Sequence, residues 1–122
     1  MINSILGFVL LFVKDSAKSA EFYSKLLGLE PVELYPTFAL FKFKNDVSLG
    51  LWANNTAQPQ VTAWPGASEI GFGQENIDAL YEQLLALGIP MAQVPTDMNF
   101  GRTFVVLDPD GHRIRFYYAR EK

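Results

Sequence analysis

The sequence predicts an α+β fold built from two copies of one βαβββ module. Two helix-like patterns end at Gly28 and Gly88, which are 60 residues apart. Each pattern follows an apolar, strand-like run and precedes three shorter strand-like runs. A period of this length with only two copies indicates a duplication, because solenoids usually need three or more repeats. We expect two sheets, each with a helix on one face, that together form a cup-shaped mixed sheet able to hold a small ligand.

The first module is expected over about residues 1–53. Its opening run, Ile5–Val13, is rich in Val, Leu and Phe and is interpreted as a buried strand. Asp15 or Ser16 can cap a helix that runs to about Leu27, where a left-handed glycine fits the end. Three strands are then predicted, with a turn at Asn45–Asp46 between the last two: Glu30–Tyr35, Phe38–Phe43 and Val47–Trp52.

A polar segment over residues 54–66 that contains two prolines is interpreted as a linker. The second module is expected over about residues 67–122, with a first strand at Glu69–Gly73 and a helix at Ile77–Leu87. Its other strands are predicted at Pro90–Val94, Thr103–Leu107 and Ile114–Tyr118, the last two joined by an Asp-Pro-Asp-Gly turn. With 122 residues in all, both modules belong to a single predicted domain.

Composition excludes several classes of protein. The chain has no cysteine, which excludes disulfides, thiolate metal sites and cysteine nucleophiles. A formal net charge of -3 argues against a nucleic-acid partner, which would favour a basic face. The longest apolar run is about half of a membrane span, and it lacks the flanks of a signal peptide. We therefore expect a cytoplasmic protein without a membrane or nucleic-acid partner.

The run from Phe8 to Asp15, with Phe22-Tyr23 and Leu27-Gly28 after it, resembles the opening of vicinal oxygen chelate proteins. The Asp108-Pro109-Asp110-Gly111 turn followed by Ile114 is similar to the closing strand of that superfamily. The superfamily contains glyoxalase I, extradiol dioxygenases and bleomycin-resistance proteins. The resemblance covers nearly the whole chain and implies the paired βαβββ architecture.

Metal-using members of the superfamily hold their ion with four ligands at equivalent points of the two modules. The resemblance places these positions at Phe8, Gly50, Glu69 and Arg115. Phenylalanine and glycine offer no donor atom, and arginine is a fixed cation, so three of the four cannot bind a metal. We therefore predict no metal and no cofactor.

A further resemblance points to the phenazine-antibiotic resistance branch of the superfamily. It is carried by Ser68-Glu69-Ile70-Gly71, by Leu51-Trp52 and by the run from Phe100 to Phe104 that leads to the closing turn. The resemblance implies a non-catalytic dimer that binds an aromatic antibiotic.

Residues two apart in a strand share a face, which predicts the lining of the cup. Glycines at positions 50, 71 and 73 should leave open space for a flat molecule between aromatic and charged side chains. The candidate ligand-binding residues are Phe8, Tyr35, Phe38, Trp52, Glu69, Phe100, Arg102, Arg115 and Tyr117.

Each candidate also has a structural interpretation. Phe8, Phe38, Tyr35 and Trp52 can simply pack in a core or an interface, and Glu69 can form an ion pair with Arg115. The segment around Arg102 is either a loop that gates the ligand or a solvated turn with a salt-bridged arginine. His112 follows the closing turn and is interpreted as a turn residue near solvent.

These observations predict a protein that binds and sequesters a planar aromatic small molecule, such as an antibiotic, without a metal. No catalytic residue is assigned. A homodimer is expected, either unswapped or domain-swapped, because a cup lined by Phe and Trp would otherwise be an exposed apolar patch. Two alternatives remain open: a metal-dependent glyoxalase- or dioxygenase-type enzyme of the same fold, and a metabolite-binding regulatory module.

Overall fold

The computed structural model describes residues 4–62 and 64–120. The chain divides into two compact units, Met1–Ala63 and Trp64–Lys122. Within the described residues each unit has one helix and four strands in the order βαβββ, as the sequence predicts. Three parts of the predicted modules and linker lie outside the described residues. They are residues 1–3, residue 63 of the linker and residues 121–122.

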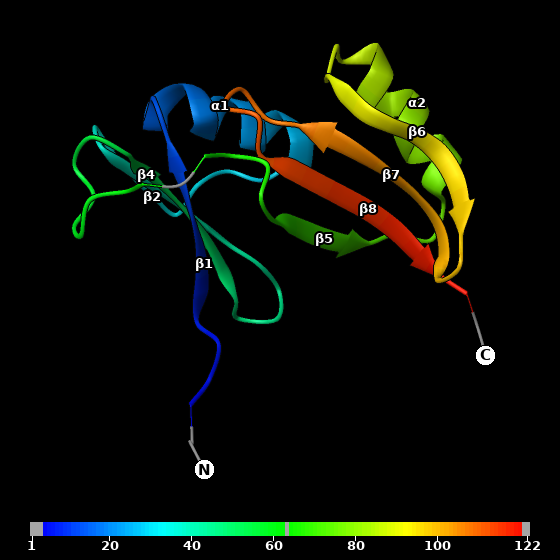
Figure 1. Cartoon of the computed structure of the whole chain (residues 1–122), viewed down its shortest axis with the longest axis horizontal. Coiled ribbons are helices and arrows are strands. Elements are labelled where there is room, and N and C mark those ends of the chain that lie inside the picture. Colours follow the sequence, from blue (N-terminus) through cyan, green and yellow to red (C-terminus); the bar gives the residue numbers. More distant parts are fainter. Residues whose placement is uncertain (1–3, 63, 121–122) are drawn as a thin grey trace. The chain divides into compact units, whose positions relative to one another are not determined.

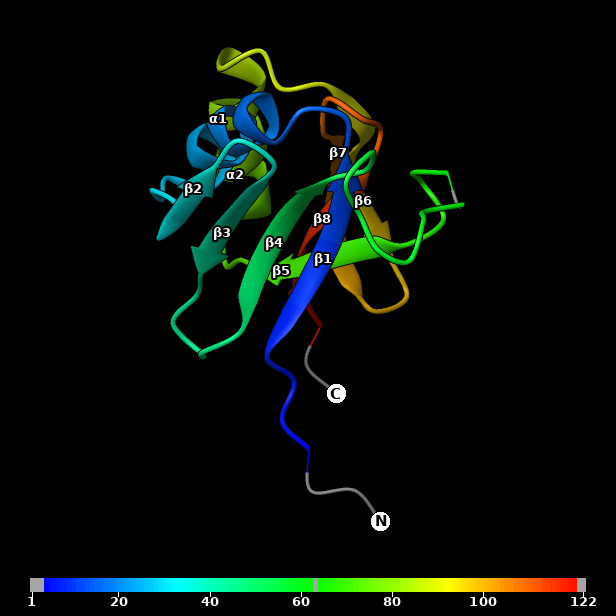
Figure 2. The same ribbon diagram turned by 90° about the vertical axis from the view of Figure 1, so that its left-hand side faces the viewer.

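The first unit is a four-stranded mixed sheet with a helix on one face. Its elements are β1 (Phe8–Val13), α1 (Ser16–Leu27), β2 (Glu33–Tyr35), β3 (Phe38–Lys42) and β4 (Ser48–Ala53). The strand order is β1-β4-β3-β2, with β1 parallel to β4 and the other pairs antiparallel (Figure 2).

Both ends of α1 follow the predicted capping pattern. The carboxylate of Asp15 accepts hydrogen bonds from the backbone N–H groups of Ala17 and Lys18. Gly28 ends the helix with a φ of 67°, a left-handed conformation that glycine adopts without strain. The local signals in the sequence therefore fix where the helix begins and ends.

The sheet of the first unit buries one face and leaves the other open. The buried face contacts Ala20, Tyr23 and Leu26 of α1, and its strand residues are Leu11, Val13, Ala39, Phe41, Leu49, Leu51 and Ala53. Because side chains alternate along a strand, the residues between them lie on the open face. That open face holds the candidate site.

The opening strand differs from its prediction. It begins at Phe8 rather than Ile5, and Ile5 and Leu6 are 94% and 67% exposed. The prediction that the whole run is buried is therefore wrong. The physical reason is pairing, because β4 begins at Ser48, opposite Phe8, and offers no strand residue to an earlier position.

The second unit repeats the arrangement. Its elements are β5 (Glu69–Gly73), α2 (Ile77–Ala86), β6 (Met91–Met98), β7 (Gly101–Leu107) and β8 (Arg113–Ala119). The strand order is β5-β8-β7-β6, with β5 parallel to β8 (Figure 1). An aromatic stack forms the core, in which the rings of Phe104 and Phe116 lie 5.3 Å apart and Tyr81 of α2 meets Phe104 edge-on.

Three strands of the second unit extend beyond their predictions, and β8 does so by one residue at each end. β6 runs to Met98 although Pro95 lies inside it. Proline is tolerated here because β6 is an edge strand with a register shift between Gln93 and Thr96. β7 begins at Gly101, so Arg102 belongs to a strand rather than to a loop.

The predicted closing turn is present. One carboxylate oxygen of Asp108 accepts hydrogen bonds from the backbone N–H groups of Asp110 and His112. Gly111 has a φ of 97°, which suits the glycine of this turn. No helix in the described part of the chain is long and apolar enough to cross a membrane.

Candidate functional site

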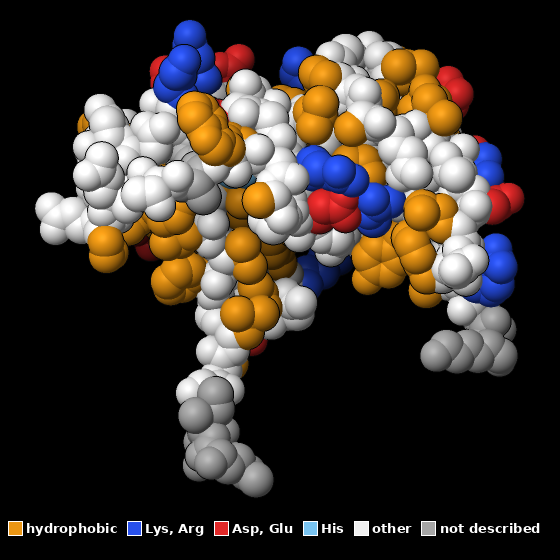
Figure 3. Space-filling model, viewed as in Figure 1, with side chains coloured by type: hydrophobic (Ala, Val, Ile, Leu, Met, Phe, Trp, Pro, Cys, Tyr) orange, Lys and Arg blue, Asp and Glu red, His pale blue; other side chains and the backbone are white. Residues whose placement is uncertain are grey.

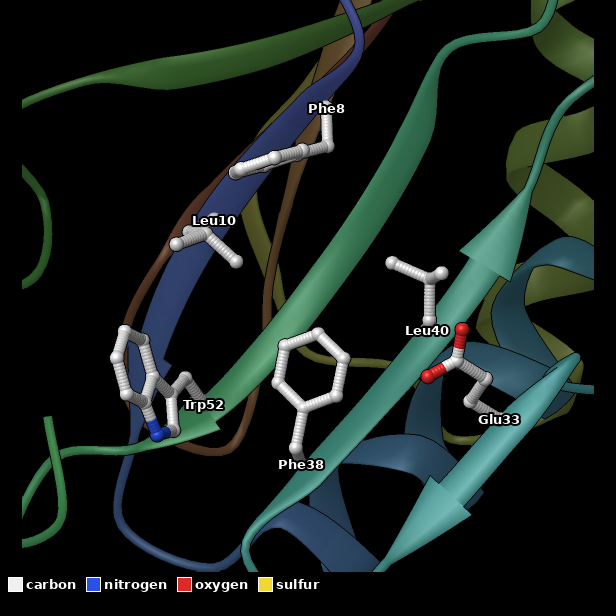
Figure 4. Close-up of a pocket in the computed structure, with 6 residues that line it drawn as sticks. All are labelled: Phe8, Leu10, Glu33, Phe38, Leu40 and Trp52. Carbon is white, nitrogen blue, oxygen red and sulfur yellow. The ribbon is translucent and has the colours of Figure 1, made fainter.

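The open face of the first sheet contains an apolar pocket of about 520 Å³, a size typical of small-molecule sites. All four strands of the first unit contribute to it, and their side chains point to the same side of the sheet (Figure 4). The lining residues are Phe8 and Leu10 of β1, Glu33 of β2, Phe38 and Leu40 of β3, and Trp52 of β4.

A glycine in β4 keeps this pocket open. Gly50 lies opposite Leu10 on β1 and Leu40 on β3. A Cβ atom at this position would lie 2.5 Å from Cδ2 of Leu10 and 3.2 Å from the ring of Phe38. Any side chain at position 50 would therefore enter the space between two lining residues.

The aromatic walls of the pocket are partly supported and partly exposed. The ring of Trp52 contacts Phe12, its register partner on β1, with ring centroids 6.0 Å apart. Phe8 is 58% exposed, which is unusual for so large an apolar side chain. The structure thus leaves aromatic surface uncovered, and Figure 3 shows hydrophobic side chains along β1 on the molecular surface.

One lining residue is charged. Glu33 lies opposite Leu40 on the neighbouring strand, and its carboxylate is exposed at the side of the pocket away from Phe8 and Trp52 (Figure 4). Among residues 4–62 and 64–120, this carboxylate has no hydrogen-bonding or ion-pair partner.

Two of the predicted site residues in the second unit form an ion pair, which confirms that alternative. Nε and Nη2 of Arg115 donate to the two carboxylate oxygens of Glu69, at 2.8 and 3.0 Å. Arg113 binds the same carboxylate, and Nη1 of Arg115 also donates to Gln93 and Thr103. Basic and acidic side chains accordingly gather over β8 in Figure 3.

This network changes the acidity of its carboxyl group. Hydrogen bonds from Arg115, helped by the charges of both arginines, hold the pKa of Glu69 below its ordinary value, although partial burial opposes the shift. Glu69 is therefore a charged structural partner of the two arginines. Both of its oxygens are occupied by guanidinium groups.

Tyr117 fills the space that two glycines of β5 leave. A Cβ atom on Gly71 would lie 3.4 Å from the Tyr117 ring, and one on Gly73 would lie 3.8 Å from the Tyr117 hydroxyl oxygen. The prediction of open space beside Gly71 and Gly73 is therefore wrong for this face, because the protein's own ring occupies it.

The remaining predicted residue pair lies at the β6–β7 hairpin. Nε and Nη2 of Arg102 donate to the carboxylate of Asp78 on α2, at 2.8 and 2.9 Å, and Nη1 donates to Asp97 at 3.1 Å. These bonds lower the pKa of Asp78 and raise that of Arg102. Arg102 is therefore salt-bridged, as one alternative predicted, but it lies in β7 rather than in the solvated turn of that prediction. Phe100 is 44% exposed at the tip of the hairpin.

Sequence reasoning placed some lining residues and missed others. Phe8, Phe38 and Trp52 come together in the pocket, whereas Tyr35 lies beside Phe38, is 57% exposed and does not line it. Leu10, Leu40 and Glu33 were not candidates. The period-2 alternation from Phe8 and Phe38 could have found the two leucines, but Glu33 depends on the pairing of β2 with β3.

The side chains present do not fit a divalent metal ion. Of the four positions that the resemblance assigns to metal ligands, only Glu69 carries a donor, and two guanidinium groups already hold it. Over residues 4–62 and 64–120, no three His, Cys, Asp or Glu side chains gather closely enough to hold a metal. A site of this fold would need several converging oxygen or imidazole donors.

Comparison with known proteins agrees with the architecture and with the predicted family. The model of the Glyoxalase/Bleomycin resistance protein/Dioxygenase superfamily matches residues 5–116. The phenazine antibiotic resistance protein EhpR of Enterobacter agglomerans is 31% identical over 117 residues, covering 87% of this chain and 85% of that protein.

Solved structures give the same result. A protein of Agrobacterium tumefaciens, solved by NMR, has a TM-score of 0.86 and 39% identity, covering 97% of this chain and 99% of that one. A glyoxalase/bleomycin resistance protein/dioxygenase from Nocardioides has a TM-score of 0.83 and 25% identity, covering 99% and 87%. The chain therefore belongs to the Glyoxalase/Bleomycin resistance protein/Dioxygenase superfamily.

Proposed function

We propose that this protein binds a planar aromatic small molecule, without a metal, and sequesters it as a means of antibiotic resistance. The observation that carries the proposal is the pocket on the first sheet, whose walls are the rings of Phe8, Phe38 and Trp52. The similarity to a phenazine antibiotic resistance protein supports a flat, multi-ring antibiotic as the ligand.

The pocket offers the interactions that such a ligand needs. A flat ring system can stack on or meet the edges of the aromatic walls, which adds about 0.5–1.5 kcal/mol for each ring pair beyond the burial of apolar area. Leu10 and Leu40 add apolar surface at the floor, and the missing side chain at Gly50 leaves room between them. The contact of Trp52 with Phe12 holds one wall in place before the ligand arrives.

Sequestration requires no bond breaking. The donor set does not suit a metal ion, and Glu33 is the only ionisable side chain among the described residues that line the pocket. Protection would then follow from mass action, because a bound drug molecule cannot reach its target. The affinity of the pocket and the amount of protein would set the degree of resistance.

We further propose that the protein acts as a homodimer. The open face of the first sheet exposes large apolar side chains, including Phe8 of β1 and, two residues along β2 from Glu33, Tyr35. Contiguous apolar surface of this kind is typical of interaction sites. A second copy of the chain, joined with or without exchange of a module, would cover it and give the ligand a second wall.

The experiment that tests the proposed function is a titration with phenazine, followed by tryptophan fluorescence. Trp64 is 86% exposed and would add fluorescence from outside the pocket, so Trp64→Phe serves as the parent protein. Variants that also lack Trp52 have no tryptophan, and their affinity is measured by isothermal calorimetry. Trp52→Ala should weaken binding by about 1–3 kcal/mol, which is roughly 5- to 150-fold, because a stacking wall is lost. Tyr35→Ala, an aromatic truncation in the same sheet outside the pocket, should leave the affinity unchanged.

Equal affinities of the parent and Trp52→Ala would remove this pocket as the binding site. Elemental analysis of the purified protein tests the absence of a metal requirement. A stoichiometric transition metal, together with phenazine binding that a chelator abolishes, would contradict metal-independent binding.

A further inference from the structure

The charged side chains on the two sheets differ in how well they are paired. Arg102 is neutralised by Asp78 and Asp97. Arg113 and Arg115 share the carboxylate of Glu69. Glu33, by contrast, lines an apolar pocket and has no partner among the described residues. The pocket therefore carries one unmatched negative charge.

We propose that the pocket selects a positively charged aromatic ligand, such as one with a cationic ring nitrogen, and that Glu33 determines this selectivity. The inference rests on the proposed function, because it names the class of ligand for the same pocket. It adds a charge requirement that the aromatic walls alone do not impose.

The position of Glu33 supports this role. In Figure 4 its carboxylate lies on one side of the pocket and Trp52 and Phe8 on the other, with the side chains of β3 between them. A flat molecule resting on the rings would extend toward the carboxylate. One end of the ligand would then meet apolar surface and the other an acceptor of positive charge.

The aromatic walls favour the same charge. The faces of Trp and Phe rings carry negative partial charge and attract a cation placed above them. A carboxylate at the edge of an apolar site adds to that attraction, whereas it repels an anionic ligand. The formal net charge of -3 on the whole chain has the same sign. Rings, carboxylate and overall charge thus agree.

The test uses three probes with the same three-ring skeleton: neutral phenazine, the permanent cation N-methylphenazinium and the anion phenazine carboxylate. Each is titrated against the full-length parent protein, Glu33→Gln and Glu30→Gln. The last variant removes the same charge from an exposed residue that does not line the pocket. A permanent cation keeps its charge at every pH, so any difference reports on the protein.

We expect the parent to bind N-methylphenazinium more tightly than phenazine and phenazine more tightly than the carboxylate. Glu33→Gln should weaken binding of the cation about two- to fivefold, because Glu33 is solvent-exposed and exposed charge pairs are weak. The same variant should change the affinity for neutral phenazine less than that for the cation, and Glu30→Gln should behave as the parent. Added salt should weaken binding of the cation more in the parent than in Glu33→Gln, which lacks the charge that salt screens.

Two results would overturn the inference while leaving the proposed function intact. In the first, Trp52→Ala loses affinity for all three probes, whereas Glu33→Gln binds each of them as tightly as the parent does. The other is tightest binding of phenazine carboxylate, with a loss on Arg113→Gln, which would move the selectivity to the arginines around Glu69. If none of the probes binds the parent, both the proposed function and the inference fail.

Discussion

The two open sheet faces of this protein have the same backbone arrangement and opposite chemistry. In the first unit, the parallel pair of β1 and β4 sets Leu10 beside Gly50. In the second unit, the parallel pair of β5 and β8 sets Gly71 beside Arg115. The first pair leads to an aromatic pocket, whereas the second leads to an ion-pair network in which two arginines share the carboxylate of Glu69.

The difference shows how a duplicated scaffold can separate two tasks. The first face leaves aromatic surface exposed to water and one carboxylate without a protein partner, so both are open to a ligand. The second face pairs its arginines with a carboxylate and covers its glycines with Tyr117. We interpret the first face as the binding surface and the second as a structural one.

The largest effect is expected from closing the first face. Gly50→Leu would insert a side chain between Leu10 and Phe38, and overpacking of this kind costs about 1–3 kcal/mol. The same side chain would occupy space that the ligand needs, so the affinity for phenazine should fall roughly tenfold or more, which corresponds to about 1.4 kcal/mol. Urea unfolding, measured beside the titration, shows whether the fold survives. A stable variant with unchanged affinity would mean that the ligand lies elsewhere.

A smaller effect is expected from opening the second face. Arg115→Met removes the paired hydrogen bonds to Glu69 and the contacts with Gln93 and Thr103, and should lower the free energy of unfolding by about 1 kcal/mol. Phenazine affinity should not change. Arg102→Met is the matched control and should cost less, since its side chain is 37% exposed against 18% for Arg115. A larger loss of stability in Arg102→Met than in Arg115→Met would show that the ion pairs around Glu69 contribute little to stability.

The smallest effect is expected from acid. Because the pKa of Glu69 is lowered in the folded state, its contribution is present above the ordinary value of 4.5 and is lost as the pH falls below it. Glu69→Gln should remove that loss, which we expect to be about 0.2–1 kcal/mol for a partly exposed pair. Urea unfolding of both proteins across this pH range measures it. Parallel curves for the two proteins would contradict the role of Glu69.

Local signals made much of the fold predictable. The cap at Asp15, the left-handed Gly28 and the turn around Asp108 depend on a few neighbouring residues, and all three are as predicted. The bounds of β5 are also those predicted, because glutamate and glycine mark the ends of a short apolar run. Such features require no knowledge of distant parts of the chain.

The site was less predictable because it depends on strand register. Glu33 joins the pocket only because β2 pairs with β3 so that Glu33 faces Leu40, and no local pattern specifies that pairing. The prediction of where β6 ends was wrong for a related reason. Pro95 normally interrupts a strand, but it is tolerated in a strand at the edge of a sheet. The partner strands, rather than the residues themselves, decided both outcomes.

The missing side chain at Gly50 also bears on how such a protein changes over generations. Several glycine codons become arginine codons through one base substitution, and arginine is the residue that stands at the matching place in the other half of the duplication. One such mutation would place an arginine side chain between Leu10 and Phe38 and would thereby close the proposed binding pocket.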